Sequence, residues 1–563
     1  MPTKSLNFQS NATCWIFWFA LALIAVLVPV FNSWFGFALP VFFDSKYSAM
    51  GGSIPYSDAA GYFHVSYSFN QLGELDSWNM RRPLNALFYA ARMKMVGYDF
   101  WNAMIFQSIM CAIPFTLYLK AIHKNFGFYS AIISLIYVCY YIWMFGSTTL
   151  SEMLGLTLGL LSFVLLWNGW FERKHLIYNI GIAALTVALM TRAGPNFLVL
   201  GALFLVYMKP FSSSWKKDLL ISCAVFIASF IFMLNLPLFF GDPSQNAALS
   251  NFSHTLYGLV NGGKLWSYCY SDPRVSESLK SVSELTHSKI LYQASWECFK
   301  ENPLNLLKGL IVYFAVFCFY FVNFFSFGPD LIKYSLRIVG GCFWGYMLYR
   351  IYNKRLEFKK DFLFLGVFVF TIAFSASVVF KDAGMRSFMV AIPFLGAIIS
   401  LAFAKKMDDS PASGNAVSIT VLCFILATAL GSKFVSFETL PDFKSKKLQD
   451  NTIITRAVHS HPYFIVQKSD ELKFHHIVLE KFKETLSLYD SFEHELDKIL
   501  ELNKDKEIVF ASLYDYASGA QKLIYGDKSM LQDHGKWVQI SMLKNHGIEN
   551  SQFWEVTSLE EYK

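Results

Sequence analysis

The chain has 563 residues, of which 54% are hydrophobic and 18% aromatic, and its mean hydropathy is +0.37. A soluble core of this size needs fewer apolar residues, so this composition excludes an ordinary soluble protein and predicts a membrane protein with many spans. The net charge of +7 is spread over short loops and forms no basic stripe, which excludes a nucleic-acid-binding protein.

Apolar segments of near membrane-crossing length recur through residues 1–432. A helix needs about 20 mostly apolar residues to cross the hydrocarbon. The segments that approach this length are 14–33, 101–119, 127–145, 150–169, 176–191, 195–208, 218–240, 304–326, 334–349, 361–380, 387–404 and 415–432. The first follows Lys4 but is long and lacks a small-residue cleavage site, so we interpret it as a retained span. The pattern predicts an all-α polytopic bundle of about 11–13 helices.

Basic loops predict the topology, because lysine and arginine concentrate on the cytoplasmic side of a membrane. The basic turns are 120–124, 173–175, 209–217, 350–360 and 405–406. With these inside, the two long loops of the membrane part, about 34–100 and 241–302, lie outside. Three crossings between residues 241 and 381 would contradict the charge rule, so one is miscounted, and segment 304–326 is a candidate for a re-entrant or interfacial segment. We follow the charge rule and place residues 381–386 outside.

The composition changes from about residue 433 onward, where apolar runs give way to charged stretches. Residues 433–563 therefore predict a small soluble α/β domain, which the topology places on the extracytoplasmic side. Helical periodicity extends over 472–502, and the run 508–513 predicts a strand.

Two of the nine cysteines, Cys269 and Cys298, lie in the loop 241–302. An oxidising compartment would allow a disulfide between them, although sequence alone does not decide the pairing. The others lie mostly in apolar segments, as small buried residues do. No cysteine spacing resembles a zinc or iron–sulfur site.

Asp58 is the candidate catalytic residue, in the sequence YSDAAGY just beyond the first span. The aromatic stretch from Tyr62 to Phe69 predicts an amphipathic helix along the membrane interface. A carboxylate partly desolvated there would serve as a general base toward a hydroxyl or amine. The alternative role for Asp58 is to cap a helix that begins at Ala59.

Five basic residues gather at the predicted outer ends of the spans: Arg81, Arg82, Arg192, Lys381 and Arg386. Charge near a membrane interior is expensive and usually functional. Arginine presents a rigid fork of donors that suits phosphate oxygens, so the set predicts a site for a lipid phosphate. For any single arginine, the alternative is a side chain that extends to the interface from a helix end.

Glu152 opens the segment 150–169 at its predicted outer end. A carboxylate near a helix start is stabilised electrostatically, which is one explanation for it. The other is that it accepts hydrogen bonds from sugar hydroxyls or orients a cation. Three aromatic residues, Tyr62, Tyr257 and Trp266, are candidates for contact with a sugar or an acceptor, and an ordinary surface loop explains them almost as well.

Six segments together resemble the glycosyltransferase-C superfamily, integral membrane enzymes such as the protein O-mannosyltransferases and the lipid A aminoarabinose transferases. In chain order they are SDAAGY, RRPLNALFYA, TTLSEMLGLTLG, LMTRAGPNFLVLG, TLYGLVNGGKLW and DAGMRSFMVAIPFLGA. They cover the chain from about residue 35 to residue 403. Each segment is degenerate alone, and their order and placement at the predicted outer ends carry the resemblance.

The resemblance implies a sugar donor linked to a polyprenyl phosphate, an outward-facing site between the first loop and the bundle, and inversion at the anomeric carbon. In that scheme Asp58 binds or deprotonates the acceptor, Arg192 and Arg386 lie near the donor phosphate, and Glu152 matches a family acid. Many relatives carry a second acid beside the first, where this chain has Ser57 and Ala59. A hard divalent cation prefers several oxygen ligands, so we expect no required metal or other cofactor.

The expected function is therefore a glycosyltransferase of the bacterial inner membrane with its site facing the periplasm. Its partners would be the lipid-linked donor, surrounding membrane lipids and an acceptor that is a protein, lipid A or a surface glycan. One alternative is a transporter or flippase for a lipid-linked glycan, which predicts paired half-structures and midplane charges that the sequence lacks. Others are an oligosaccharide ligase or polymerase that uses a diphosphate-linked donor, and a non-catalytic scaffold.

Overall fold

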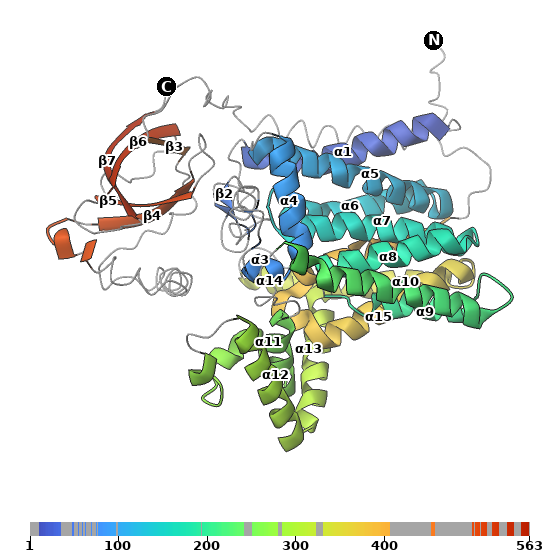
Figure 1. The fold of residues 1–563 in the computed structure, drawn as a ribbon. Coiled ribbons are helices and arrows are strands. Elements are labelled where there is room, and N and C mark those ends of the chain that lie inside the picture. Colours follow the sequence, from blue (N-terminus) through green and yellow to red (C-terminus); the bar gives the residue numbers. More distant parts are fainter. Residues whose placement is uncertain are drawn as a thin grey trace, which may run out of the picture.

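Most of the described chain is α-helical in the computed structural model, and its C-terminal part contributes a sheet (Figure 1). The structure describes residues 11–34, 48–49, 54–55, 59, 62, 69, 75, 77–96, 100–192, 194–240, 250–279, 284–322, 330–405, 452–456, 498–499, 501–506, 508–514, 521–527, 537–544 and 553–561.

The helices follow the expected apolar segments closely. In chain order the α-helices are α1 (Asn11–Trp34), α3 (Ser77–Met80), α4 (Pro83–Met95), α5 (Phe100–Phe126), α6 (Phe128–Phe145), α7 (Ser151–Phe171), α8 (His175–Thr191), α9 (Leu198–Met208), α10 (Trp215–Asn235), α11 (Ser250–Val260), α12 (Glu284–Glu301), α13 (Leu304–Val322), α14 (Asp330–Lys354), α15 (Lys359–Ala383) and α16 (Ile392–Leu401). Short 3₁₀ helices are η2 (Leu236–Phe239), η4 (Trp266–Tyr270), η5 (Glu277–Leu279) and η7 (Gly384–Ala391).

Within the described residues, eight helical stretches are long and apolar enough to cross a membrane. They lie in α1, α5, α6, α7, α10, α13 and α15 and in the joined η7 and α16. Two further expected spans form the shorter apolar helices α8 and α9. The protein is thus an integral membrane protein with a polytopic helical bundle. The expected span 415–432 and the expected domain boundary near residue 433 lie outside the described residues.

Helix α13 is the expected span whose crossing the charge rule brought into question. Figure 1 shows α11, α12 and α13 standing at a steep angle to α5, α6, α7 and α8. The Tyr313 hydroxyl donates to Asp382 over 3.1 Å, and the rings of Phe317 and Tyr320 both pack on Phe380, at 5.0 and 5.7 Å. The stretch from Tyr313 to Tyr320 therefore lies against one end of α15. Helix α13 is long and apolar enough to cross a membrane, and it is inclined to the central helices (Figure 1).

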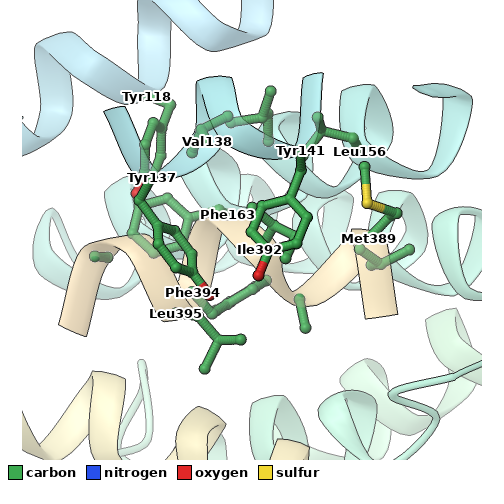
Figure 2. Close-up of a cluster of buried hydrophobic side chains, with 14 of the residues drawn as sticks. Tyr118, Tyr137, Val138, Tyr141, Leu156, Phe163, Met389, Ile392, Phe394 and Leu395 are labelled. Atoms are coloured by element: carbon green, nitrogen blue, oxygen red, sulfur yellow. The ribbon is translucent and has the colours of Figure 1, made fainter. Parts of the chain in front are cut away.

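The centre of the bundle is built around the segment from η7 into α16, which packs among α5, α6 and α7. Figure 2 shows Met389, Ile392 and Phe394 of this segment surrounded by buried side chains of those helices, including Tyr118 and Phe163. The Tyr118 hydroxyl donates to the carbonyl of Pro393 over 2.9 Å, and the rings of Phe163 and Phe394 lie 5.2 Å apart. This packing fixes η7, the short turn that precedes α16, against the start of α7.

Residues 250–301, called the 250–301 unit below, contain α11, η4, η5 and α12 around a small core of their own. The disulfide that the sequence left open is not formed in the structure, where Cys269 and Cys298 are both free thiols. Cys269 lies on η4 with its sulfur 3.3 Å from His254 Nδ1, and Cys298 lies on α12, where Arg274 donates to its sulfur over 3.0 Å. Each thiol has a different polar partner, so the core does not bring the two together.

The C-terminal part contributes a five-stranded sheet in the order β3-β6-β7-β5-β4. The strands are β3 (Thr452–Arg456), β4 (Ile508–Tyr514), β5 (Gln521–Asp527), β6 (Trp537–Lys544) and β7 (Phe553–Glu561). Only β5 and β7 pair in parallel. The strand expected at 508–513 is confirmed by β4, whereas most of the expected helical stretch 472–502 lies outside the described residues.

Candidate functional site

A buried carboxylate shared by two arginines lies at one end of the bundle. Glu152 is in the first turn of α7 and has a fully buried side chain. Its Oε1 accepts hydrogen bonds from Arg192 Nη2, at the end of α8, and from Arg386 Nε, on η7. The side chain of Arg192 is 4% exposed and that of Arg386 14%. Residues far apart in the sequence thus form one group, the Glu152 cluster.

Glycines allow these segments to approach each other closely. A Cβ on Gly155 would lie 3.2 Å from the Cβ of Arg192, and a Cβ on Gly159 would lie 2.7 Å from the carbonyl oxygen of Val390. At Gly384 the chain adopts a φ of +56°, a conformation that favours glycine. There the chain leaves α15 and turns so that Arg386 lies against the start of α7.

Two more of the expected site residues lie near the Glu152 cluster. Arg82, at the start of α4, acts electrostatically on both Glu152 and Arg192. Tyr62 is 2% exposed and also interacts electrostatically with Arg192. Among the described residues, the cluster thus brings three arginines to one carboxylate. Glu152 Oε2 and Arg192 Nε are buried and make no hydrogen bond.

The first loop is attached to the same end of the bundle. Thr149, three residues before Glu152, donates its hydroxyl to the carbonyl of Ala59 over 2.5 Å. Asn85 of α4 donates to the carbonyl of Thr149 over 3.3 Å. Ala59 directly follows Asp58, the expected general base, which itself lies outside the described residues. The structure therefore joins the segments SDAAGY, RRPLNALFYA and TTLSEMLGLTLG, which the sequence related only by their order.

The positions of the two charged turns, 381–386 and 350–360, agree with the topology predicted from the basic loops. Arg386 pairs with Glu152, so residues 381–386 lie at the same end of the bundle as the start of α7. The basic turn 350–360 lies at the other end, where the ring of Phe358 packs 5.8 Å from that of Phe126 at the end of α5. The two charged turns are thus separated by the length of the bundle, as the sequence predicts.

The remaining two expected phosphate ligands point elsewhere. Lys381 Nζ donates to the carbonyl of Gly263 in the 250–301 unit. Arg81 Nη1 donates to Asn251 of α11 over 2.9 Å. These contacts fasten the 250–301 unit to the bundle. Asp382, which the sequence did not single out, does the same, since its Oδ1 accepts from the Trp266 amide over 3.0 Å and from the Tyr313 hydroxyl.

The aromatic candidates of this unit differ from each other. Trp266 is 46% exposed and available for contact with a partner. Tyr257 is fully buried, and its hydroxyl donates to Asp272 over 2.7 Å, so its hydroxyl is held within the unit. Glu152 combines two of the features considered for it, since it lies in the first turn of α7 and its Oε1 accepts from both Arg192 and Arg386.

Asp272 anchors a second carboxylate–arginine group, the Asp272 cluster, which also contains Arg274, Tyr257 and Asn261. Asp272 accepts from Arg274 Nη2 over 2.6 Å and from the Tyr257 hydroxyl, while Arg274 Nη2 also donates to Asn261 over 2.6 Å. The hydrogen-bonding Arg274 guanidinium holds the pKa of the Asp272 carboxyl well below its usual range. Burial raises the pKa of the Tyr257 hydroxyl.

The described residues contain no group of three or more histidine, cysteine, aspartate and glutamate side chains arranged to hold a metal ion. The Glu152 cluster supplies guanidinium donors, which are suited to an anion rather than to a cation.

Comparison with known proteins gives little further help. No protein-family model and no curated protein match the chain. Matching solved structures include crystal structures of ArnT from Cupriavidus metallidurans in the apo state and bound to undecaprenyl phosphate. Both are 13% identical, and the match covers 70% of this chain and 77% of ArnT with TM-scores of 0.29 and 0.30. A likeness this low carries no argument about function, which we base on the motifs and the site.

Proposed function

We propose that this protein is a membrane glycosyltransferase that moves a sugar from a polyprenyl-phosphate donor to an acceptor at the membrane surface. The observation that supports the proposal is the Glu152 cluster, in which the described residues place Arg82, Arg192 and Arg386 around one buried carboxylate. Guanidinium groups gathered in this way suit a phosphate or another anion. The motif resemblance identifies the phosphate of a lipid-linked sugar as that anion.

In the proposed reaction, the acceptor oxygen attacks the anomeric carbon while the bond from that carbon to the phosphate oxygen breaks. Configuration inverts, because the attack comes from the face opposite the phosphate. The acceptor proton passes to the Asp58 carboxylate, and the electron pair of the broken bond stays on the polyprenyl phosphate. No metal takes part in this scheme.

The arginines act on the leaving group. As the bond breaks, negative charge builds on the phosphate, and guanidinium groups already held in position stabilise that charge. Glu152 keeps Arg192 and Arg386 in place before the donor arrives, so their orientation costs nothing during the reaction. Its side chain is rigidly held in the first turn of α7, where a carboxylate is favoured.

The assignment of Asp58 as base is supported by its neighbour. The hydrogen bond between Ala59 and Thr149 ties this part of the first loop to the segment that carries Glu152. We further propose that the protein lies in a bacterial inner membrane with this end facing the periplasm, and that its acceptor is a protein, lipid A or a surface glycan.

The test uses purified full-length protein in lipid nanodiscs with a panel of radiolabelled polyprenyl-phosphate and polyprenyl-diphosphate sugars. Wild type is compared with Asp58→Asn and Arg386→Gln, with and without a chelator. We expect Asp58→Asn to lower the rate by about 10²–10⁴, the usual contribution of a general base. For Arg386→Gln we expect a loss of about 10²–10³, as for removal of one oxyanion donor.

The matched control is Arg355→Gln, an arginine in the basic turn at the other end of the bundle that stacks on Tyr352. Its transfer rate should stay within about twofold of wild type. Normal turnover by Asp58→Asn would refute the catalytic assignment. Turnover of diphosphate donors alone would instead identify a ligase or polymerase, and donor translocation without sugar transfer would identify a transporter.

A further inference from the structure

Arg92 is a buried arginine that the proposed reaction does not use. It lies in the last turn of α4, is 1% exposed, and pairs with no carboxylate in the part of the chain that the structure describes. Its guanidinium lies over the rings of Phe88 and Tyr89, at 4.9 and 4.8 Å. Burial lowers its pKa to about 10, which leaves it charged at neutral pH.

The hydrogen bond that Arg92 makes is to Gln107 of α5. Arg92 Nη1 donates to Gln107 Oε1 over 2.5 Å, whereas its Nε and Nη2 make no hydrogen bond. Gln107 is itself 4% exposed. Because a guanidinium has only donors, the oxygen of the Gln107 amide must face Arg92, and the amide nitrogen must face away.

The Gln107 nitrogen faces the loop between α6 and α7. It donates to the carbonyls of Gly146 and Thr148, over 3.3 and 3.4 Å. This loop ends at Ser151, where α7 begins, and Glu152 is the second residue of that helix. With its amide reversed, Gln107 would turn its oxygen toward two carbonyl oxygens and repel the loop.

We propose that Arg92 and Gln107 are positioning residues for Glu152. Arg92 sets the orientation of the Gln107 amide, the amide holds the loop 146–150, and the loop sets where α7 begins. Glu152 in turn orients Arg192 and Arg386 toward the donor phosphate, so this inference rests on the proposed function. A small displacement of such groups is enough to slow a reaction about 10²-fold.

The decisive variant is Gln107→Glu. The new carboxylate faces Arg92 and forms a buried ion pair with it, but it can no longer donate to Gly146 and Thr148. The buried ion pair offsets the repulsion of the loop, so we expect the thermal midpoint in nanodiscs to stay near that of wild type, while kcat for sugar transfer falls about 10- to 100-fold and KM for the donor changes less. Hydrogen exchange should increase in peptides that cover residues 146–155 and remain unchanged elsewhere.

Two companion variants complete the experiment. Asn125→Asp also replaces a side-chain amide of α5 by a carboxylate, but near the other end of that helix. There the Asn125 amide donates to the carbonyl of Ala121, and the variant should leave kcat unchanged. Arg92→Lys keeps a donor to Gln107 and should retain more activity than Arg92→Met, which has none.

Each outcome decides the inference. Wild-type kcat in Gln107→Glu would overturn it, and so would a loss of kcat accompanied by a lower thermal midpoint and faster exchange throughout the chain, which is the signature of a purely structural role. If wild type transfers no sugar from any donor, the proposed function fails, and hydrogen exchange over 146–155 still decides whether Gln107 holds the loop.

Discussion

The Glu152 cluster and the Asp272 cluster each pair a buried carboxylate with arginine, but they balance charge and hydrogen bonds differently. Asp272 meets a single arginine, and a tyrosine and an asparagine take up further hydrogen bonds of the pair. Glu152 meets Arg192 and Arg386 with Arg82 nearby, and it retains an oxygen without a hydrogen bond. The first group matches one carboxylate to one arginine, whereas the described part of the second gathers three arginines around one carboxylate.

The charge balance of a buried cluster is thus a criterion for separating structural from functional ion pairs in one chain. An ion pair whose charges balance and whose polar atoms are hydrogen-bonded stabilises the fold without a bound ligand. A pair with excess charge is unfavourable in a membrane protein unless a ligand of opposite sign completes it. The two clusters therefore predict different responses to substitution, pH and chemical labelling.

The largest effect should come from Glu152→Ala. This variant leaves Arg192 buried without its partner, which costs about 3–5 kcal/mol when one member of a buried pair is removed. The measurement is the shift of the thermal unfolding midpoint in nanodiscs. The control is Glu172→Ala, because Glu172 and its partner Lys174 are both exposed and such pairs contribute about 0–1 kcal/mol. Equal midpoints for the two variants would contradict the assigned role of Glu152.

A smaller effect is expected from Gly159→Ala, which tests the close approach of α7 and η7. The added methyl group would lie 2.7 Å from the carbonyl oxygen and 3.0 Å from the Cα of Val390, so the backbone that carries Arg386 must move. Overpacking of this kind costs about 1–3 kcal/mol. Thermal unfolding and transfer rate should both decline.

The matched control for this variant is Gly366→Ala in α15, where an added Cβ meets no atom within 4 Å. It should leave the thermal midpoint and the transfer rate near wild type. If Gly159→Ala behaves in the same way, the glycine is not what allows η7 to lie against α7.

The Asp272 cluster should respond to acid. Since Arg274 lowers the folded-state pKa of Asp272, the cluster contributes stability above the unfolded pKa of about 3.9 and loses it as pH falls through that value toward the folded pKa. Hydrogen exchange of the 250–301 unit should therefore increase between about pH 5 and pH 3. In Asp272→Asn the unit should exchange faster at pH 7 and depend less on pH. Parallel pH profiles for the two proteins would show that Asp272 does not stabilise this unit.

Cysteine labelling should report on the same unit without disturbing it. Burial raises the pKa of the Cys269 thiol to about 11, so alkylation of the folded protein at pH 8 should be slow at this position. After denaturation without reductant, both Cys269 and Cys298 should react, which peptide mass spectrometry would detect. Failure of both to react before reduction would restore the disulfide that the sequence suggested.

The helices of the membrane part could be anticipated because hydrophobicity is a local property. A run of about 20 apolar residues must form a helix to satisfy its backbone in a membrane, whatever its neighbours are. The segments 127–145 and 150–169 accordingly form α6 and α7 almost as expected. Segment 304–326 shows the limit, since its composition suits a span, but only the tertiary structure shows that Tyr313 and Phe317 lie against the end of α15.

The residues of the candidate site likewise fall into those that the sequence could identify and those that only the structure reveals. The sequence identified Glu152, Arg192 and Arg386 as charged residues at span ends, because such charges are rare and costly there. It could not tell them from Lys381, or Trp266 from Tyr257, since burial and partners depend on how distant segments pack. Gln107 and Arg92 gave no sequence signal, because their roles exist only through the loop that they hold.

What the sequence determined by itself is the class of protein, the helical segments and the types of residue available for chemistry. The tertiary structure decided which of those residues meet. Glu152 is separated by 40 residues from Arg192 and by 234 from Arg386, and their contact follows from glycine-mediated packing of α7 against η7. Helix formation is governed by neighbours in the chain, whereas an ion pair is governed by neighbours in space.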